Sequence, residues 1–156
     1  MSIQCSYKKQ DGNQCKMKTA RQYPTCWIHL KKEDGLQVKD SKIPNAGKGL
    51  FYVGKQAIPP KTKIAKYSSR EILRKNPETD YTLQFSRNQY MDSSDKLNHV
   101  GRYINDSKKA NVRFGNSYRA QKEVINNHTR YTIPIITTKR IQPNTELLIS
   151  YGNKYW

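Results

Sequence analysis

The sequence predicts a mainly β domain with short helices and a small N-terminal zinc-binding unit. Two observations predict the β fold: short runs of β-branched, aliphatic and aromatic residues recur along the chain, and Gly, Pro, Asn and Ser bound them. The third observation is that all three cysteines fall within the first 26 residues. A length of 156 residues suits one ordinary domain with a small appendage.

The order of elements follows from these runs. Seven segments have strand composition: 36–38, 50–53, 62–67, 82–85, 112–114, 131–136 and 146–150. Only 69–75 and 97–103 favour a turn or two of helix. Many short strands with few helices indicate several small sheets.

The charge balance points to an acidic partner. Twenty-nine Lys and Arg against twelve Asp and Glu give a net charge of +17, which favours DNA, RNA or a nucleosome surface. Solubility alone is the alternative explanation. The mean hydropathy is −0.97, so the core is thin and a structural metal would support it. We expect an intracellular protein with no membrane contact, because the chain has neither a long apolar run nor an N-terminal secretory signal.

The cysteines form a pattern that suits zinc. Cys5, Cys15 and Cys26 are followed by His29 in the spacing C-x9-C-x10-C-x2-H. Zinc binds four N or S ligands in a tetrahedron, and the Cys-x2-His turn supplies two of them. The alternative is three unrelated thiols and a surface histidine.

We expect residues 1–33 to form this zinc-finger-like unit and residues 35–156 to form the main domain. Asp11-Gly12 predicts a hairpin turn between the first two cysteines. Tyr23 and Trp27 are the aromatic residues expected to supply the unit's apolar packing. Its role stays open between a nucleic-acid clip, a protein-docking module and a structural brace.

Three stretches carry the chemistry. They are Ala46-Gly47-Lys48-Gly49-Leu50-Phe51, Gly101-Arg102-Tyr103-Ile104-Asn105-Asp106-Ser107 and Glu146-Leu147-Leu148-Ile149-Ser150-Tyr151-Gly152. In this order and separation they resemble the motifs of the SET-domain protein (histone) lysine methyltransferases. The resemblance covers most of the chain after residue 35. It implies a SET-type fold of small curved sheets with a knot-like active site.

The resemblance also implies a binding site for S-adenosylmethionine. In the family, backbone groups of the first motif and the side chain of the motif asparagine hold this cofactor. The corresponding residues here, together with a looser aromatic match and a C-terminal tryptophan that could fold over the cofactor, are Gly47, Lys48, Gly49, Leu50, Tyr81, Arg102, Asn105, Asp106 and Trp156.

Methyl transfer to lysine needs a neutral amine in a water-poor channel, aligned by hydroxyl groups. An aromatic wall lowers the pKa of the amine by desolvation and tolerates the methylated ammonium. Tyr151 matches the family's catalytic tyrosine, and Tyr67 and Tyr103 match channel aromatics. A half-buried strand tyrosine is the alternative for the latter two.

Some positions depart from the family pattern. Asp106 replaces the usual histidine, and Lys61 and Asn144 stand at turns where the family favours glycine, so we expect left-handed backbone there. No cysteine follows Cys26, so the chain lacks the cysteine-rich segment that closes the substrate channel in many members. Tyr155, Trp156, the zinc unit or a second subunit in a homodimer would close it instead. Such a minimal, stand-alone chain resembles the viral and bacterial SET proteins.

The expected function is therefore methylation of a lysine, on a histone tail in chromatin, with the basic surface on nucleosomal DNA. The expected location is the nucleus, or the host nucleus for a viral protein. A non-histone lysine is a second substrate class. The alternative from a different class is a zinc- and lysine-rich nucleic-acid or chromatin-binding module with an inactive SET-like domain.

Overall fold

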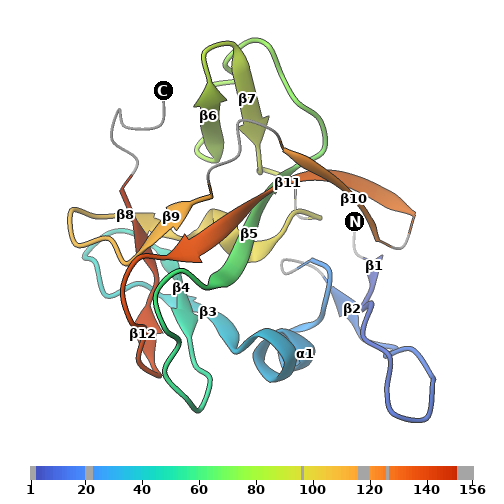
Figure 1. Cartoon of the computed structure of the whole chain (residues 1–156). Helices are drawn as coiled ribbons and strands as arrows, with labels where there is room; N and C mark the ends of the chain where they lie inside the picture. The colour runs from blue at the N-terminus through green and yellow to red at the C-terminus, as the bar shows by residue number, and fades with distance from the viewer. Residues whose placement is uncertain (1–2, 20–22, 96, 116–119, 126, 151–156) are drawn as a thin grey trace.

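The computed structural model describes residues 3–19, 23–95, 97–115, 120–125 and 127–150. Within these residues the chain forms four small sheets and a few short helical turns, arranged around one main core (Figure 1). The β-rich fold class is confirmed. No helix in the described part of the chain is long and apolar enough to cross a membrane.

The elements follow one another closely. The strands are β1 (Ile3–Gln4), β2 (Lys18–Thr19), β3 (Leu36–Asp40), β4 (Lys48–Tyr52), β5 (Lys63–Ser69), β6 (Thr82–Ser86), β7 (Gln89–Asp92), β8 (Asn105–Asp106), β9 (Val112–Phe114), β10 (Gln121–Ile125), β11 (His128–Thr137), β12 (Thr145–Glu146) and β13 (Leu148–Ile149). The helical turns are α1 (Trp27–His29), the π-helical η1 (Leu30–Asp34) and the 3₁₀ turn η2 (Val100–Tyr103).

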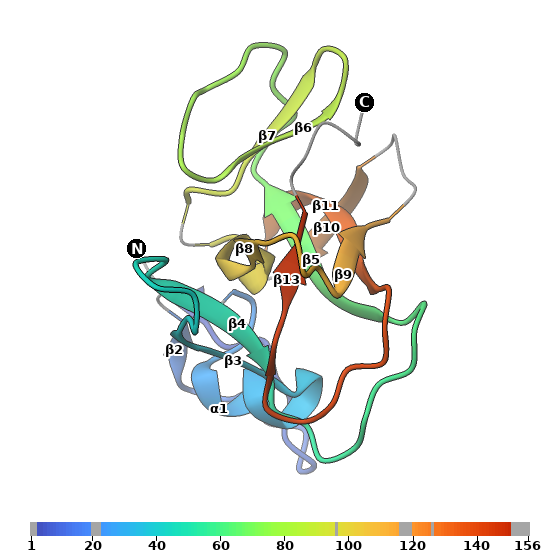
Figure 2. The same cartoon turned by 90° about the vertical axis from the view of Figure 1, so that its left-hand side faces the viewer.

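The largest sheet brings the second and third motifs together. Its strand order is β10-β11-β9-β13-β8, and β5 also pairs with β11. β13 runs parallel to both β8 and β9, placing Leu148 opposite Asn105 and Ile149 opposite Val112. Figure 2 shows β13 between these two strands. A separate sheet, β12-β4-β3, carries the first motif on β4 and joins it to the third through β12.

The turn η2 lies against β5 at a position that only glycine fits. A Cβ on Gly101 would come within 2.1 Å of the Lys66 carbonyl oxygen and 2.7 Å of Ile135. This contact holds the turn against the sheet, so the next residues, Arg102 and Tyr103, are fixed where β8 begins. The glycine before the arginine of the second motif is thus a packing requirement.

Most predicted elements are present. Each of the seven predicted strand segments overlaps a strand, and the last is divided into β12 and β13. Lys61 and Asn144 have φ of 65° and 63°, as expected at those turns. The Asp11-Gly12 turn is also confirmed, with Gly12 at φ 85° and the Lys9 N–H donating to the Asn13 carbonyl.

Two predictions are wrong, the helix at residues 69–75 and the packing of Trp27, and a third is confirmed in part. Residues 69–75 form no helix, because Ser69 ends β5 and Leu73 pairs through its backbone with Tyr90. Of the second helical segment, 97–103, only η2 is helical. Trp27 does not pack inside the N-terminal unit, since it is 44% exposed, whereas Tyr23 is buried against His99 of the main domain.

A partly buried charge cluster lies where the N-terminal unit meets the main domain. Glu123 of β10 places one carboxylate oxygen 2.7 Å from His99 Nε2 and the other 2.8 Å from Lys66 Nζ. The ring of Tyr23 meets that of His99 edge-on at 5.4 Å. The hydrogen bond with His99, helped by Lys66, lowers the pKa of Glu123 to about 2 against the effect of burial. Burial, with the nearby Glu123 charge, raises the pKa of Tyr23 to about 12.

Glu123→Gln tests this cluster. The folded-state pKa of about 2 lies below the ordinary value of 4.5, so the carboxylate stabilises the fold above pH 4.5 and loses that contribution as the pH falls toward 2. Urea unfolding at pH 7 should show a loss of about 2–3 kcal/mol in the variant. The difference in unfolding free energy between the variant and the wild type should narrow between pH 5 and pH 3. Glu71→Gln, at an exposed side chain without a hydrogen bond to a described residue, is the control; a gap constant with pH would contradict the assignment.

Candidate cofactor pocket and metal centre

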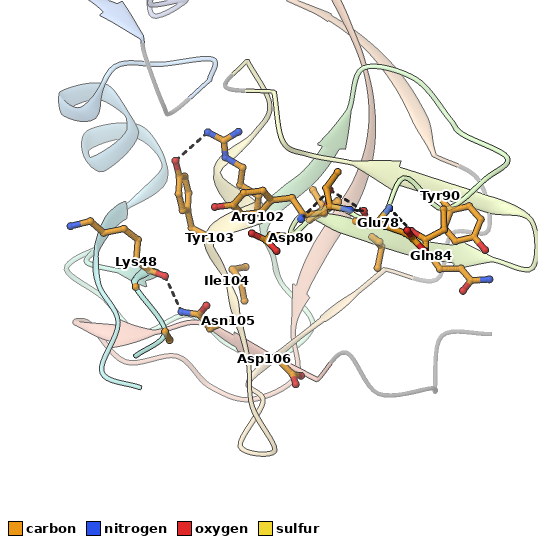
Figure 3. A pocket seen from close by; sticks show the side chains of 18 residues that line it. Lys48, Glu78, Asp80, Gln84, Tyr90, Arg102, Tyr103, Ile104, Asn105 and Asp106 are labelled. Atoms are coloured by element: carbon orange, nitrogen blue, oxygen red, sulfur yellow. Dashed lines mark hydrogen bonds between the residues drawn. The ribbon is translucent and has the colours of Figure 1, made fainter. Parts of the chain in front are cut away.

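A cavity of about 810 Å³ opens where the first and second motifs meet. Its lining comes from residues 46–48, 67, 76, 78–84, 90 and 102–106. Figure 3 shows these side chains around the opening. The loop before β6, the β6–β7 hairpin and the β8 strand thus form walls around the glycine-containing turn that precedes β4.

One hydrogen bond joins the two motifs across the pocket. The side-chain amide of Asn105 donates to the Lys48 carbonyl at 2.9 Å (Figure 3). Asn105 is half-buried at the start of β8, where its backbone pairs with Leu148. The first motif is therefore held at a fixed distance from the second, and the polar groups of both are brought to the same opening.

A buried carboxylate lies behind this junction. Glu146 is 5% exposed, and one of its oxygens accepts from the Ser41 hydroxyl at 2.7 Å while the other accepts from the Lys42 N–H at 2.9 Å. The Asn105 amide lies 3.5 Å from the same carboxylate. A Cβ on Gly49 would come within 2.4 Å of it. Gly49 thus has a packing reason to lack a side chain, because it makes room for this carboxylate.

Arg102 organises the opposite wall. Its guanidinium is buried and donates to the carbonyls of Asp95 at 2.6 Å and Ser93 at 3.1 Å, and to the Tyr103 hydroxyl at 3.1 Å. It also stacks over the Tyr103 ring, 4.9 Å from its centroid. These contacts anchor the loop after β7, so Arg102 acts here through the residues it positions.

The described tyrosines of the predicted channel lie together. Tyr67 is buried on β5, donates its hydroxyl proton to the Tyr81 carbonyl and meets Phe114 edge-on at 5.7 Å. Tyr103 lines the same cavity. Tyr151, the predicted catalytic residue, lies outside the described residues.

Eight of the predicted site residues line the cavity. They are Gly47, Lys48, Tyr67, Tyr81, Arg102, Tyr103, Asn105 and Asp106. Gly49 and Leu50 lie on β4 behind it, and Leu50 belongs to the main hydrophobic core. Trp156 lies outside the described residues.

Sequence reasoning missed part of the wall. Residues 76, 78 and 79 of the loop before β6 and residue 84 of β6 line the cavity, and no motif marks them. The lining carries three carboxylates, on Glu78, Asp80 and Asp106, against the cations of Lys48 and Arg102. In a chain of net charge +17, this opening therefore does not share the basic character of the whole. Such a lining is compatible with a ligand that carries positive charge.

The predicted metal ligands converge on one point. The ligand atoms of Cys5, Cys15, Cys26 and His29 all lie within 4.8 Å of one another. His29 Nδ1 is 3.5 Å from Cys5 Sγ and 3.4 Å from Cys26 Sγ. A tetrahedral zinc with ordinary bond lengths separates an S and an N ligand by about 3.5 Å. The three thiols are buried, the Tyr7 ring stacks on His29 at 3.9 Å, and the donor set fits zinc.

Glu146→Gln tests the carboxylate behind the pocket. The amide replaces one acceptor with a donor that faces other donors, so unfolding should cost about 2 kcal/mol less free energy than in the wild type. Affinity for S-adenosylmethionine, measured by calorimetry, should fall about tenfold because the two motifs lose their shared anchor.

Gly49→Ala disturbs the same carboxylate, because the added Cβ would collide with Glu146. The effects of Glu146→Gln and Gly49→Ala should therefore combine less than additively in a double-mutant cycle. Additive effects, or unchanged affinity in both variants, would contradict the role given to Glu146.

Metal analysis of the full chain tests the zinc centre. The purified protein should contain about one zinc per chain, and cobalt exchange should give the absorption of a tetrahedral thiolate site. Cys26→Ser should lose the metal and the stability of the N-terminal unit. His29→Ala should also weaken metal binding. Its matched control is His128→Ala, at a histidine outside the cluster. Full metal retention in Cys26→Ser would exclude the assigned ligand set.

Comparison with known proteins agrees with this architecture. The family model of the SET domain matches residues 47–152. The fold matches those of 242 chains of solved structures. One is the crystal structure of a Plasmodium falciparum protein described as a "putative histone methyltransferase", with a TM-score of 0.50 and 18% identity over 80% of this chain and 98% of that chain. A search of curated proteins found no match.

The structural likeness at this identity concerns the fold. The family model covers about two thirds of the sequence and spans all three motifs. Members of this family are S-adenosylmethionine-dependent lysine methyltransferases. The chain belongs to the SET-domain family.

Proposed function

We propose that the protein is an S-adenosylmethionine-dependent protein-lysine N-methyltransferase that acts on a histone tail in chromatin. The observation that carries the proposal is that the first two motifs meet at one cavity and the third packs behind their junction. Asn105 of the second motif bonds to Lys48 of the first, and Glu146 of the third contacts Asn105 and leaves no room for a side chain at Gly49. This geometry supports a cofactor site at the opening, formed by Gly47, Lys48 and residues 102–106.

The residues around the cavity fit the needs of the reaction. S-adenosylmethionine supplies an electrophilic methyl group on a sulfonium sulfur. The lysine amine must arrive neutral, and a buried aromatic surface such as that of Tyr67, which packs on Phe114, favours its deprotonated form. The Tyr67 hydroxyl already donates to Tyr81, and a phenol oxygen in that state can accept a hydrogen bond from the amine.

Tyr151 is the residue that we assign to the catalytic role in this proposal, with Tyr67 and Tyr103 as positioning groups. Ser150 is the residue before it, and Ile149 pairs with Asp106 at the rim of the cavity. Methyl transfer breaks the carbon–sulfur bond, forms the carbon–nitrogen bond and releases the amine proton to solvent.

The rest of the chain would bind chromatin. With a net charge of +17, the protein repels a basic tail in isolation and attracts nucleosomal DNA, which would present the tail at high local concentration. Residues 1–33 would form a zinc-braced unit and residues 35–156 the catalytic domain. A nuclear or chromatin location follows from this substrate.

The same charge favours a second candidate, a nucleic-acid or chromatin-binding module whose SET domain is inactive. In that case the zinc unit and the exposed lysines would carry the function. The two candidates differ in one measurable property, the transfer of a labelled methyl group.

Transfer from labelled S-adenosylmethionine to free histones, nucleosomes and lysate proteins tests the proposal. Histone label should appear with the wild type and fall about 10²-fold or more in Tyr151→Phe, because the phenol no longer aligns the amine. Binding of the cofactor and of DNA should be unchanged. Tyr131→Phe, on β11 outside the cavity lining, is the control.

Each outcome separates the candidates. Label on a non-histone protein alone would remove the histone assignment and keep the reaction class. DNA binding without any transfer, in the presence of bound cofactor, would favour the inactive module.

A further inference from the structure

The N-terminal unit presents two large apolar side chains to solvent, one after the other. Trp27 is 44% exposed and Ile28 is 62% exposed. Neither residue belongs to the main core or to the cysteine cluster. Both lie between the metal ligands Cys26 and His29, so bound zinc would fix the direction in which they point. Adjacent, rigid and unpacked apolar groups are typical of an interaction surface.

These side chains line a hollow beside an edge strand. The hollow has a volume of about 310 Å³ and is formed by Trp27, Ile28, Lys31, Gln37 and Val38. It lies between the α1–η1 segment and β3. Both views place α1 on the side of β3 away from β4 (Figures 1 and 2). It shares no lining residue with the cofactor cavity.

The backbone of β3 is open toward this hollow. β3 is the terminal strand of the sheet β12-β4-β3 among the described residues. The Val53 N–H bonds to the Gly35 carbonyl, and the Ser41 N–H bonds to the Gly47 carbonyl. Bonded pairs alternate in an antiparallel ladder, so Gln37 and Lys39 face β4 while Val38 turns its N–H and C=O outward. An extended peptide could pair with that edge.

Charge selects the occupant. Lys31 is the charged residue that lines the hollow, whereas Glu33 and Asp34 of η1 line a different hollow, beside His99. A second copy of a chain with net charge +17 would be repelled. A basic histone tail would be repelled as well, so this surface differs from the one expected for the substrate. Nucleic acid would use the lysines and leave the apolar hollow and the strand edge without a matching group.

We propose that the α1–β3 hollow binds an extended acidic segment of a partner protein. An apolar side chain of that segment enters between Trp27 and Val38, its backbone pairs with β3, and a flanking carboxylate meets Lys31. The surface is a docking site separate from catalysis, and it places the enzyme on a partner complex, where substrate lysines are presented at raised local concentration.

Fluorescence anisotropy with the full, zinc-loaded chain tests the proposal. The probe is a labelled nonapeptide, Asp-Glu-Asp-Val-Phe-Val-Glu-Asp-Glu, and its counterpart carries lysine at each acidic position. The acidic probe should bind and the lysine probe should not. Ile28→Ser should weaken binding about tenfold or more, while Val124→Ser should leave it unchanged. Val124 is the matched control because it is 61% exposed, almost as much as Ile28 at 62%, and lies on β10.

Two charge-reversal variants compare Lys31, which lines the hollow, with its neighbour Lys32. Lys31→Glu should weaken binding more than Lys32→Glu, although both change the net charge by the same amount, because only Lys31 lines the hollow. Methyl transfer to free histones and the zinc content should be unchanged in all four variants, which shows that they are folded.

Four results would overturn the proposal. They are equal binding of both probes, no binding of either, displacement of the acidic probe by a short DNA duplex with the same affinity in the wild type and Ile28→Ser, and a dimer in sedimentation velocity that Ile28→Ser dissolves. The last result would assign the surface to a second copy of the chain. None of these results depends on whether the SET domain is active.

Discussion

The structure of the candidate site depends on the buried carboxylate of Glu146. It lies on β12 and is reached by donors from the segment after β3 and from β8. A buried charge is stable only when its oxygens accept several hydrogen bonds, and here two come from the adjacent residues Ser41 and Lys42 and one from Asn105. The carboxylate therefore links the third motif to the second and to the segment that leads into the first. The space it needs explains why a glycine stands at position 49.

Much of the fold could be predicted because its strands are apolar or β-branched where they are buried. β11 shows this well, since Ile133 and Ile135 alternate toward the core. β10 could not be predicted: its residues are mostly polar and exposed, and it is a strand only because β11 pairs with it. The helix predicted at 69–75 was wrong for a related reason, because Leu73 pairs with Tyr90, which is distant in sequence.

The site was predicted from short motifs, and these identified residues whose polar groups reach the cavity. They could not identify residues that reach it through tertiary folding alone, such as Glu78 and Thr79 on the loop before β6. They also gave Gly49 a role in approaching the ligand, and the structure adds that a side chain at this position would meet Glu146.

The N-terminal unit and the main domain are joined by more than their linker. Leu30 of η1 lies in the main hydrophobic core, and Tyr23 pairs through its backbone with His99, which contacts Glu123. The path from the cysteine cluster to η2 is short, because Val100 follows His99 directly. The metal ligands and the second motif are thus parts of one continuous packed structure.

The parallel insertion of β13 between β8 and β9 affects how the chain can fold during its synthesis. β8 ends at Asp106 and β9 ends at Phe114, whereas β13 begins only at Leu148. Neither strand can complete its pairing until β13 has left the ribosome. A growing chain therefore has unpaired edges on β8 and β9 until residues 148–149 have been made. Nascent polypeptides of this protein would be targets for chaperones up to that point.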